Sequence, residues 1–130
     1  MNGRKLIGNE RGQAMTEFAV VLPILVVLLL GIVQFGIVFN NYVTLTDAVR
    51  AGARMAAVSR QASDPVGAAT AAVDAAAANL DQSNLPVKVT SSWAPGSTVT
   101  VTATYPYSIS LLGWVINAGS LTSTTTERVE

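Results

Sequence analysis

The chain has 130 residues, a formal net charge of zero and a charged fraction of only 12%, whereas half of its residues are hydrophobic. So little charge is unusual for a soluble domain. The absence of cysteine and histidine excludes disulfides, cysteine-based zinc sites, thiol nucleophiles and Ser-His pairs. Because the sequence also lacks a basic cluster and a glycine-rich phosphate loop, it predicts no nucleic-acid or nucleotide partner.

The first distinctive motif joins Gly12 to Glu17. Four residues separate the two, and Glu17 stands directly before Phe18, where a long apolar run begins. This spacing is typical of type IV prepilins, which are cut after the glycine on the cytoplasmic side of the membrane. Neither of the two glycines further upstream fits the pattern, because no glutamate stands at the fifth position after either of them.

A cut after Gly12 would give Gln13 a free ammonium group. Glu17 follows one helical turn later, so its carboxylate could neutralise this charge within the chain or in a neighbouring chain packed with an axial stagger. In the second case Glu17 would set the register between chains, since a carboxylate at an apolar boundary needs a partner. The alternative interpretation is a carboxylate that lies among lipid headgroups at a favourable helix N-terminus.

The apolar run covers residues 18–39 and contains Gln34 as its only polar side chain. At about 1.5 Å per residue it reaches roughly 33 Å, enough to cross a hydrocarbon core of about 30 Å. A secretory signal peptide is shorter and carries its small-x-small cleavage site directly after the apolar region, whereas the nearest such site here, Ala51-Gly52-Ala53, lies well beyond the run. The sequence therefore predicts one transmembrane helix over residues 18–39.

The charges that flank this run predict its orientation. Arg4, Lys5 and Arg11 stand against Glu10 on the N-terminal side, whereas five basic and six acidic residues follow residue 39. Cytoplasmic flanks carry the excess of basic residues. We therefore expect a cytoplasmic N-terminus and an extracytoplasmic segment from residue 40 to residue 130.

The helical pattern continues beyond the membrane over residues 40–60, which contain no proline. At 100° per residue Ala48, Gly52 and Ala56 fall on one narrow stripe, and such small residues allow another element to approach closely. We expect this stripe to pack against the globular part of the same chain, with a contact between subunits as the alternative. One helix of roughly 70 Å, with a kink at Pro23, would then form a stalk.

Asp47, Arg50 and Arg54 fall on the opposite side of the same helix. The simplest interpretation is a solvated face on which one acid partly offsets two bases. A salt bridge between chains is the alternative.

A second helix is predicted within "SDPVGAATAAVDAAAANL". Asp64 suits the N-cap position and Pro65 the first helical position. The predicted apolar face is mostly alanine, so it can approach its partner closely but buries little area. Its members recur at helical spacing and are Val66, Ala69, Val73, Ala76 and Leu80.

The period changes to two from residue 86, which predicts a β-hairpin with one buried face. Ala94-Pro95-Gly96-Ser97 has the proline and glycine of a type II turn. Pro106 is expected to end the second strand, and residues 120–129 to return as a third strand. The alternating apolar positions are Val87, Val89 and Trp93 before the turn, and Val99, Val101, Ala103 and Tyr105 after it.

The segment "YPYSISLLGWVINAG" lies between the second and third predicted strands and is too short to span a membrane. We interpret it as a flap that closes over the small sheet. A patch that contacts another subunit or the membrane surface is the alternative. Its apolar residues are Leu111, Leu112, Trp114, Val115 and Ile116.

Two stretches of the chain resemble a known family. "ERGQAMTEFAVVLPILVVLLLGIVQFGIVFNNYVTLTDAVRAGARMAA" looks like the N-terminal part of the TadE-like pseudopilins of tight-adherence (Flp) pilus systems, and "VTVTATYPYSISLLGWVINAGSLTSTTTERVE" is similar to their C-terminal strands. The resemblance implies cleavage between Gly12 and Gln13 by a membrane aspartyl prepilin peptidase, and other pilins, pseudopilins and pilus assembly membrane proteins as partners. Gln13 would then be the first mature residue, where the better-known type IV pilins have phenylalanine.

The sequence thus predicts a pilin-like α+β protein with a leader over 1–12, a long helix over 13–60 and an extracytoplasmic α+β domain over 61–130. With the resemblance, it indicates a minor pseudopilin of the bacterial cytoplasmic membrane that helps to initiate or organise a pilus for surface adherence. The alternative is an unprocessed single-pass anchor whose outer domain binds another envelope component. We expect no enzyme, cofactor, metal or small-molecule substrate, since the scattered acids show no converging spacing.

Overall fold

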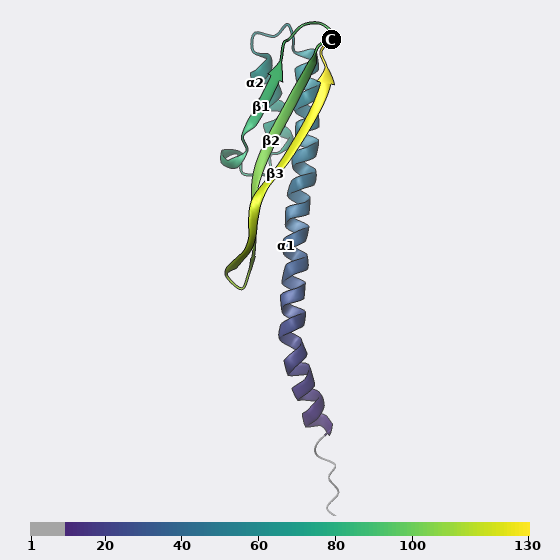
Figure 1. Cartoon of the computed structure of the whole chain (residues 1–130), viewed down its shortest axis with the longest axis vertical. Helices are drawn as coiled ribbons and strands as arrows, with labels where there is room; N and C mark the ends of the chain where they lie inside the picture. Colours follow the sequence, from purple (N-terminus) through teal and green to yellow (C-terminus); the bar gives the residue numbers. More distant parts are fainter. Residues whose placement is uncertain (1–9) are drawn as a thin grey trace, which may run out of the picture.

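The computed structural model of the protein describes residues 10–130. Its elements are α1 (Glu10–Val58), α2 (Pro65–Ala76), the short 3-10 helix η1 (Gln82–Asn84), β1 (Val87–Ser91), β2 (Thr98–Leu111) and β3 (Trp114–Arg128). The strands form one antiparallel sheet in the order β1-β2-β3, which confirms the predicted α+β class. The sheet and α2 lie beside the C-terminal part of α1, and the N-terminal part of α1 projects beyond them (Figure 1). The first nine residues of the expected leader lie outside the described residues.

The helix α1 is long and apolar enough to cross a membrane, by length and composition. Pro23 lies inside it, and the helix continues without a break on both sides of this residue. The missing backbone hydrogen bond is therefore accommodated within the helix. Every residue from 10 to 30 is exposed, whereas buried residues begin at Leu45. The two halves of α1 thus meet different surroundings: the first half has no cover from its own chain, and the second carries the folded domain.

The core lies between the C-terminal half of α1, α2 and one face of the sheet. Both helices cover the same face, because alternate side chains of β2 are buried and the residues between them are not. On the opposite face threonine hydroxyls pair across the strands, Thr100 with Thr126 at 3.1 Å and Thr102 with Thr124 at 3.0 Å. The largest fully buried side chains are Leu45, Val49, Val73, Val99, Val101 and Val129.

The predicted start of α2 is confirmed. The helix begins at Pro65, and the Asp64 carboxylate accepts a hydrogen bond of 2.8 Å from the backbone N–H of Gly67. The predicted apolar face is correct at Ala69, Val73 and Leu80 and wrong at Val66 and Ala76, which are exposed. Because the chain leaves the helix after Ala76, the core is instead continued by the cap residue and the turn that follows. The buried residues of this segment are Ala69, Val73, Ala77 and Leu80.

The loop after α2 is held by side chains that cap backbone groups. Gln82 donates from its amide nitrogen to the carbonyls of Ala77 at 2.7 Å and Leu80 at 3.3 Å. Asp81 caps η1 and accepts hydrogen bonds from the hydroxyl of Ser83 at 2.6 Å and from its backbone N–H at 3.0 Å. These bonds, the hydroxyl bond first, lower the pKa of the Asp81 carboxyl below its ordinary value.

The turn between β1 and β2 has the predicted form. The Ser97 backbone N–H donates to the Ala94 carbonyl at 3.0 Å, and Gly96 has a φ of 76°, as the third residue of a type II turn requires. The turn is also joined to the end of the chain, because Val129 accepts a hydrogen bond from Gly96 and donates one to Ser97, at 2.9 and 2.8 Å. The same end reaches α1, where the Glu130 backbone N–H donates to the Ala57 carbonyl at 3.1 Å.

The prediction that Pro106 ends the second strand is wrong. β2 continues to Leu111, and Pro106 is paired with Ser120 of β3. The physical reason lies in the direction of the backbone groups. The N–H of Thr104 donates to the Pro86 carbonyl at 3.2 Å, so the nitrogen of Pro106, two residues later, also faces the β1 side. Because β1 pairs with β2 only up to Ala103, no ladder hydrogen bond is lost at Pro106.

β3 is correspondingly longer than the predicted third strand of residues 120–129, because it begins at Trp114. Leu111 pairs with Trp114, so Leu112 and Gly113 form a two-residue turn with φ values of 53° and 84°. Positive φ at both positions defines a type I′ hairpin turn. The segment that was expected to be a flap is therefore the end of a long β2–β3 hairpin, and it does not close over the sheet.

The close contact of Gly52 with its own domain gives a stability prediction. A Cβ atom at this position would clash with the Val73 side chain and would lie 3.1 Å from the Ala69 carbonyl oxygen. We expect Gly52→Leu to destabilise the domain by about 1 to 3 kcal/mol, because α2 would have to move away from α1. Thermal unfolding of the full-length protein in detergent, followed by circular dichroism, would measure the loss.

Gly36→Leu is the matched control for this experiment. An added Cβ at Gly36 meets nothing within 4 Å, so this variant should unfold at the temperature of the parent protein. Equal melting temperatures for both variants would show that Gly52 is not a packing position.

Candidate functional site

The N-terminal end of α1 carries the Gly12 and Glu17 motif. Because α1 begins at Glu10, the peptide bond between Gly12 and Gln13 lies in its first turn. The Gln13 amide nitrogen donates to the Glu17 carboxylate at 3.1 Å, and the Thr16 hydroxyl donates to the Gly12 carbonyl at 2.9 Å. The helix thus places the carboxylate of residue 17 beside residue 13, as the separation of four residues predicts.

Both ends of this motif are open to other molecules. A Cβ atom added at Gly12 would meet nothing within 4 Å, and Glu17 is exposed. Phe18, the first residue of the apolar run, is 60% exposed. Among residues 10–130 the structure contains one ion pair, between Asp47 and Arg50. Glu17 therefore has no cationic partner in this part of the chain. Its only side-chain partner there is a neutral amide, which leaves its charge uncompensated.

The small-residue stripe lies inside the protein. Ala48, Gly52 and Ala56 are all buried, and the space above Gly52 is occupied by Val73 and Ala69 of α2. These three residues face the chain's own domain, the arrangement expected from their size and spacing.

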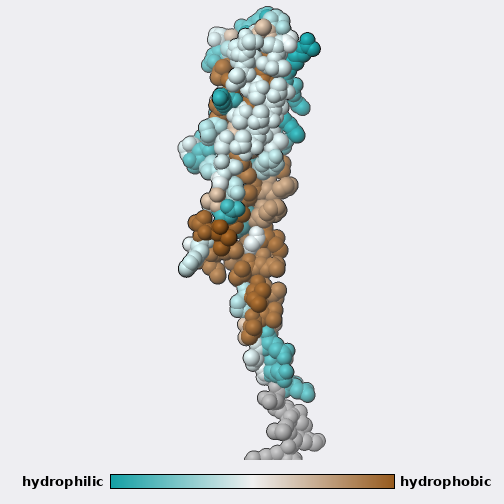
Figure 2. All heavy atoms as spheres, in the orientation of Figure 1, coloured by the Kyte–Doolittle hydropathy of each residue, from teal (hydrophilic) through white to brown (hydrophobic). Residues whose placement is uncertain are grey.

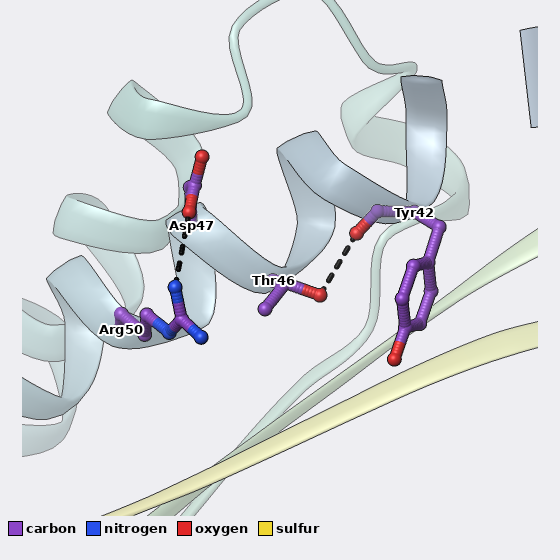
Figure 3. Close-up of polar contacts among 4 residues, drawn as sticks. All are labelled: Tyr42, Thr46, Asp47 and Arg50. Atoms are coloured by element: carbon purple, nitrogen blue, oxygen red, sulfur yellow. Dashed lines mark hydrogen bonds and ion pairs between the residues drawn. The ribbon is translucent and has the colours of Figure 1, made fainter. Parts of the chain in front are cut away.

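The charged residues of α1 lie on its solvent side. The Arg50 guanidinium is 3.5 Å from the Asp47 carboxylate, and both side chains are largely exposed, at 60% and 66%. Figure 3 shows this pair beside the Thr46 hydroxyl, which donates to the Tyr42 carbonyl at 2.9 Å. Arg54 is also exposed but forms no ion pair within residues 10–130. An exposed pair of this kind stabilises a helix by about 0.3 kcal/mol. The structure thus brings Asp47 and Arg50 together, but their contact gives no evidence of a functional site.

The predicted contact patch lies at the tip of the β2–β3 hairpin. Leu112 and Trp114 are 72% and 79% exposed, and Val115 and Ile116 are exposed as well. Leu111 is half-buried. The tip lies beside the middle of α1 (Figure 1), and hydrophobic side chains gather both there and on the neighbouring part of the helix (Figure 2).

One polar contact joins the hairpin to α1, and the sequence did not indicate it. The Gln34 side-chain amide donates to the Ser110 carbonyl at 3.2 Å, across 76 residues of sequence. Gln34 is the only polar side chain of the apolar run over residues 18–39. Its polarity in this setting was the available signal, because an amide in an apolar environment needs a hydrogen-bond partner.

The acidic residues of the described part of the chain do not cluster as a metal site would require. Within residues 10–130, no group of three or more His, Cys, Asp or Glu side chains lies close enough to hold a metal ion. The features that remain are the open Gly12 and Glu17 motif, the bare apolar half of α1 and the exposed hairpin tip. All three are suited to contacts with other macromolecules or lipid.

Comparison with known proteins gives one match. The family model described as TadE-like protein matches residues 12–54, which begin at Gly12 and include the whole apolar run. No curated protein and no solved structure matches the chain significantly. The matched segment links the chain to Tad pilus systems, whose TadE-like proteins are structural components. Residues 12–54 of this chain are therefore similar to the TadE-like family.

Proposed function

We propose that this chain is a minor pseudopilin that is cut between Gly12 and Gln13 and helps to initiate or organise a Tad pilus for surface adherence. α1 holds it in the bacterial cytoplasmic membrane, with the N-terminus in the cytoplasm and the domain outside. Its partners are a prepilin peptidase, other pilins or pseudopilins and the membrane proteins of the assembly machinery. The observation that carries the proposal is the open Gly12 and Glu17 motif at the start of a TadE-like segment.

The surroundings of Gly12 support recognition by another protein. Gly52 is required by the fold, because a side chain there would collide with α2, whereas a side chain at Gly12 would collide with nothing in the chain. Glycine also lowers helix stability relative to alanine, so this residue gains the fold nothing at the start of α1. A small residue at this position is what the pocket of a peptidase that binds the scissile bond would require.

The surroundings of Glu17 support a role after cleavage. The cut creates an ammonium group at Gln13, whose side chain already lies beside the Glu17 carboxylate. A carboxylate that enters the membrane without a partner costs about 3 kcal/mol. The new ammonium of the same chain, or of a neighbour shifted along the helix axis, removes this cost. Pairing between chains would fix the axial register in which the bare halves of neighbouring α1 helices pack.

The first test of this function is Gly12→Val. The β-branched side chain should fill the space that a peptidase needs next to the scissile bond, while membrane insertion continues because the apolar run is unchanged. Cells that contain a prepilin peptidase should accumulate a precursor heavier by the 12-residue leader, as measured by mass spectrometry of the intact protein. Gly8→Val is the control and should be processed normally, because Gly8 lacks the glutamate at the required spacing.

The mass of the parent protein decides between the two candidate functions. A pseudopilin should begin at Gln13 in such cells. If the intact protein retains Met1, it is the unprocessed single-pass anchor, and the pseudopilin function is refuted.

The orientation gives a second test. Because the basic residues are concentrated before the span, alkaline phosphatase fused after Glu130 should be active and a cytoplasmic reporter at the same position inactive. Protease added to spheroplasts should degrade the domain that follows α1. Complete protection of this domain would reverse the proposed orientation.

The third test is Glu17→Gln, which removes the charge and keeps the size. We expect normal insertion and cleavage but a strong loss of pili, scored by electron microscopy of a deletion strain complemented with the variant. Glu10→Gln is the matched control, because it removes an exposed acid from the leader that cleavage discards. An acid moved to Thr16 in the Glu17→Gln background should rescue poorly, since it points about 100° away around the helix. Normal piliation by Glu17→Gln would mean that the carboxylate is only a boundary residue at headgroup level.

A further inference from the structure

The tip of the β2–β3 hairpin lies at the height of the apolar run of α1. Its position is fixed by the 3.2 Å hydrogen bond from Gln34 to the Ser110 carbonyl, one residue before the strand end at Leu111. Along α1 the residues that face the hairpin are half-buried from Gly31 onward, at Gly31, Gln34 and Val38. Residues 10–30 carry no such cover. The hairpin therefore descends past the outer end of the run and stops within it.

The depth of the tip follows from the geometry of the helix. The apolar run ends at Phe39, and Gln34 lies five positions closer to the N-terminus. At 1.5 Å per residue this places the Gln34 contact with Ser110 about 7.5 Å inside the end of the run, and Gly31, the first half-buried residue on the hairpin side, about 12 Å inside it. Amphipathic segments that lie in the membrane interface reach a depth of roughly 5 to 10 Å. If α1 crosses a bilayer over this run, the hairpin enters this interface at Ser110, and its tip reaches the adjoining part of the acyl chains.

The composition of the hairpin is compatible with this position. No Asp, Glu, Lys or Arg occurs between Lys88 and Glu127, so no charge has to be desolvated along β2 or most of β3. The side chains of Leu112, Trp114, Val115 and Ile116 are apolar and exposed, Leu112 and Trp114 to more than 70%. Tryptophan is enriched at membrane interfaces.

The backbone sets a limit to the depth. Within the hairpin, β2 and β3 are paired up to Leu111 and Trp114 with a register shift between Ile109 and Ser110, so the backbone groups between the strands have partners and the ladder positions on the two outer edges are open. Above it β2 has a free edge, because β1 ends its pairing at Ala103. Open edges are not tolerated in the hydrocarbon core. Insertion is therefore limited to a depth at which water and lipid headgroups can still form hydrogen bonds with these edges.

We propose that the hairpin tip, residues 111–116, is a second membrane contact, which inserts into the interface of the bilayer that α1 spans. The occupant of this surface is lipid. Two contacts fix the rotation of α1 about its axis and hold the domain against the membrane. This inference requires only that α1 crosses the bilayer, so it does not depend on cleavage or on a pilus.

The two tryptophans of the chain are suitable probes because they lie at opposite ends of the domain. Trp114 is at the hairpin tip, whereas Trp93 precedes the turn that is joined through Val129 and Glu130 to Ala57. Gln34 and Ala57 are about 35 Å apart along α1. Trp93→Phe leaves the tip as the sole probe, and Trp114→Phe leaves the distal end as the control.

Both variants are reconstituted as full-length protein in vesicles of phosphatidylethanolamine and phosphatidylglycerol, and fluorescence quenching by brominated lipids is measured. Trp114 should lose most of its emission to lipids brominated near the headgroup end of the acyl chain, and less to lipids brominated near the chain terminus. Trp93 should keep its emission with both lipids and be quenched by aqueous iodide. Trp114 that is unquenched by lipid overturns the proposal: quenching by iodide then indicates a tip in water, and protection from iodide a tip covered by protein.

Discussion

The continuity of α1 across the edge of its apolar run is the constraint on which the rest of the structure depends. A single helix must present apolar residues on all sides to lipid in its first half and one narrow face to a small domain in its second half. The first half meets this demand with residues that are all exposed up to position 30, and the second with buried Leu45, Ala48 and Gly52. Because helix and domain share one rigid element, the membrane position of the helix determines the position of every surface above it.

Much of the fold could be predicted because its signals are local. The transmembrane run, the Asp64 cap and the type II turn at residues 94–97 each depend on residues close together in sequence. The two main errors have different causes. Pro106 is tolerated because β1 ends before it, a fact about another strand. The turn at Leu112 and Gly113 was missed because it lacks the asparagine or aspartate that usually marks a type I′ turn.

The candidate site also has one part that could be predicted from the sequence and one part that could not. The contact between residues 13 and 17 could be predicted, because it depends only on linear spacing in one helix, whereas cleavage after Gly12 stays a prediction. The apolar residues around Trp114 could be identified as a patch, but their role could not be read from composition. Only the contact between Gln34 and Ser110, across 76 residues, shows that this patch lies beside the apolar run. The flap interpretation failed because it assumed that apolar residues must cover the chain's own sheet, whereas this hairpin directs them outward.

The glycines of α1 look alike in the sequence, but the structure shows that they have different surroundings. At Gly52 a side chain would displace α2, so the fold itself requires the glycine. At Gly12, Gly31 and Gly36 an added Cβ meets nothing within 4 Å, although glycine weakens a helix at each of these positions. A glycine that the fold does not need, in a helix that it weakens, points to a partner outside the chain. For Gly12 the partner that we propose is a prepilin peptidase. Gly31 and Gly36 lie within the run that faces lipid or a neighbouring helix, where small residues permit close packing between helices.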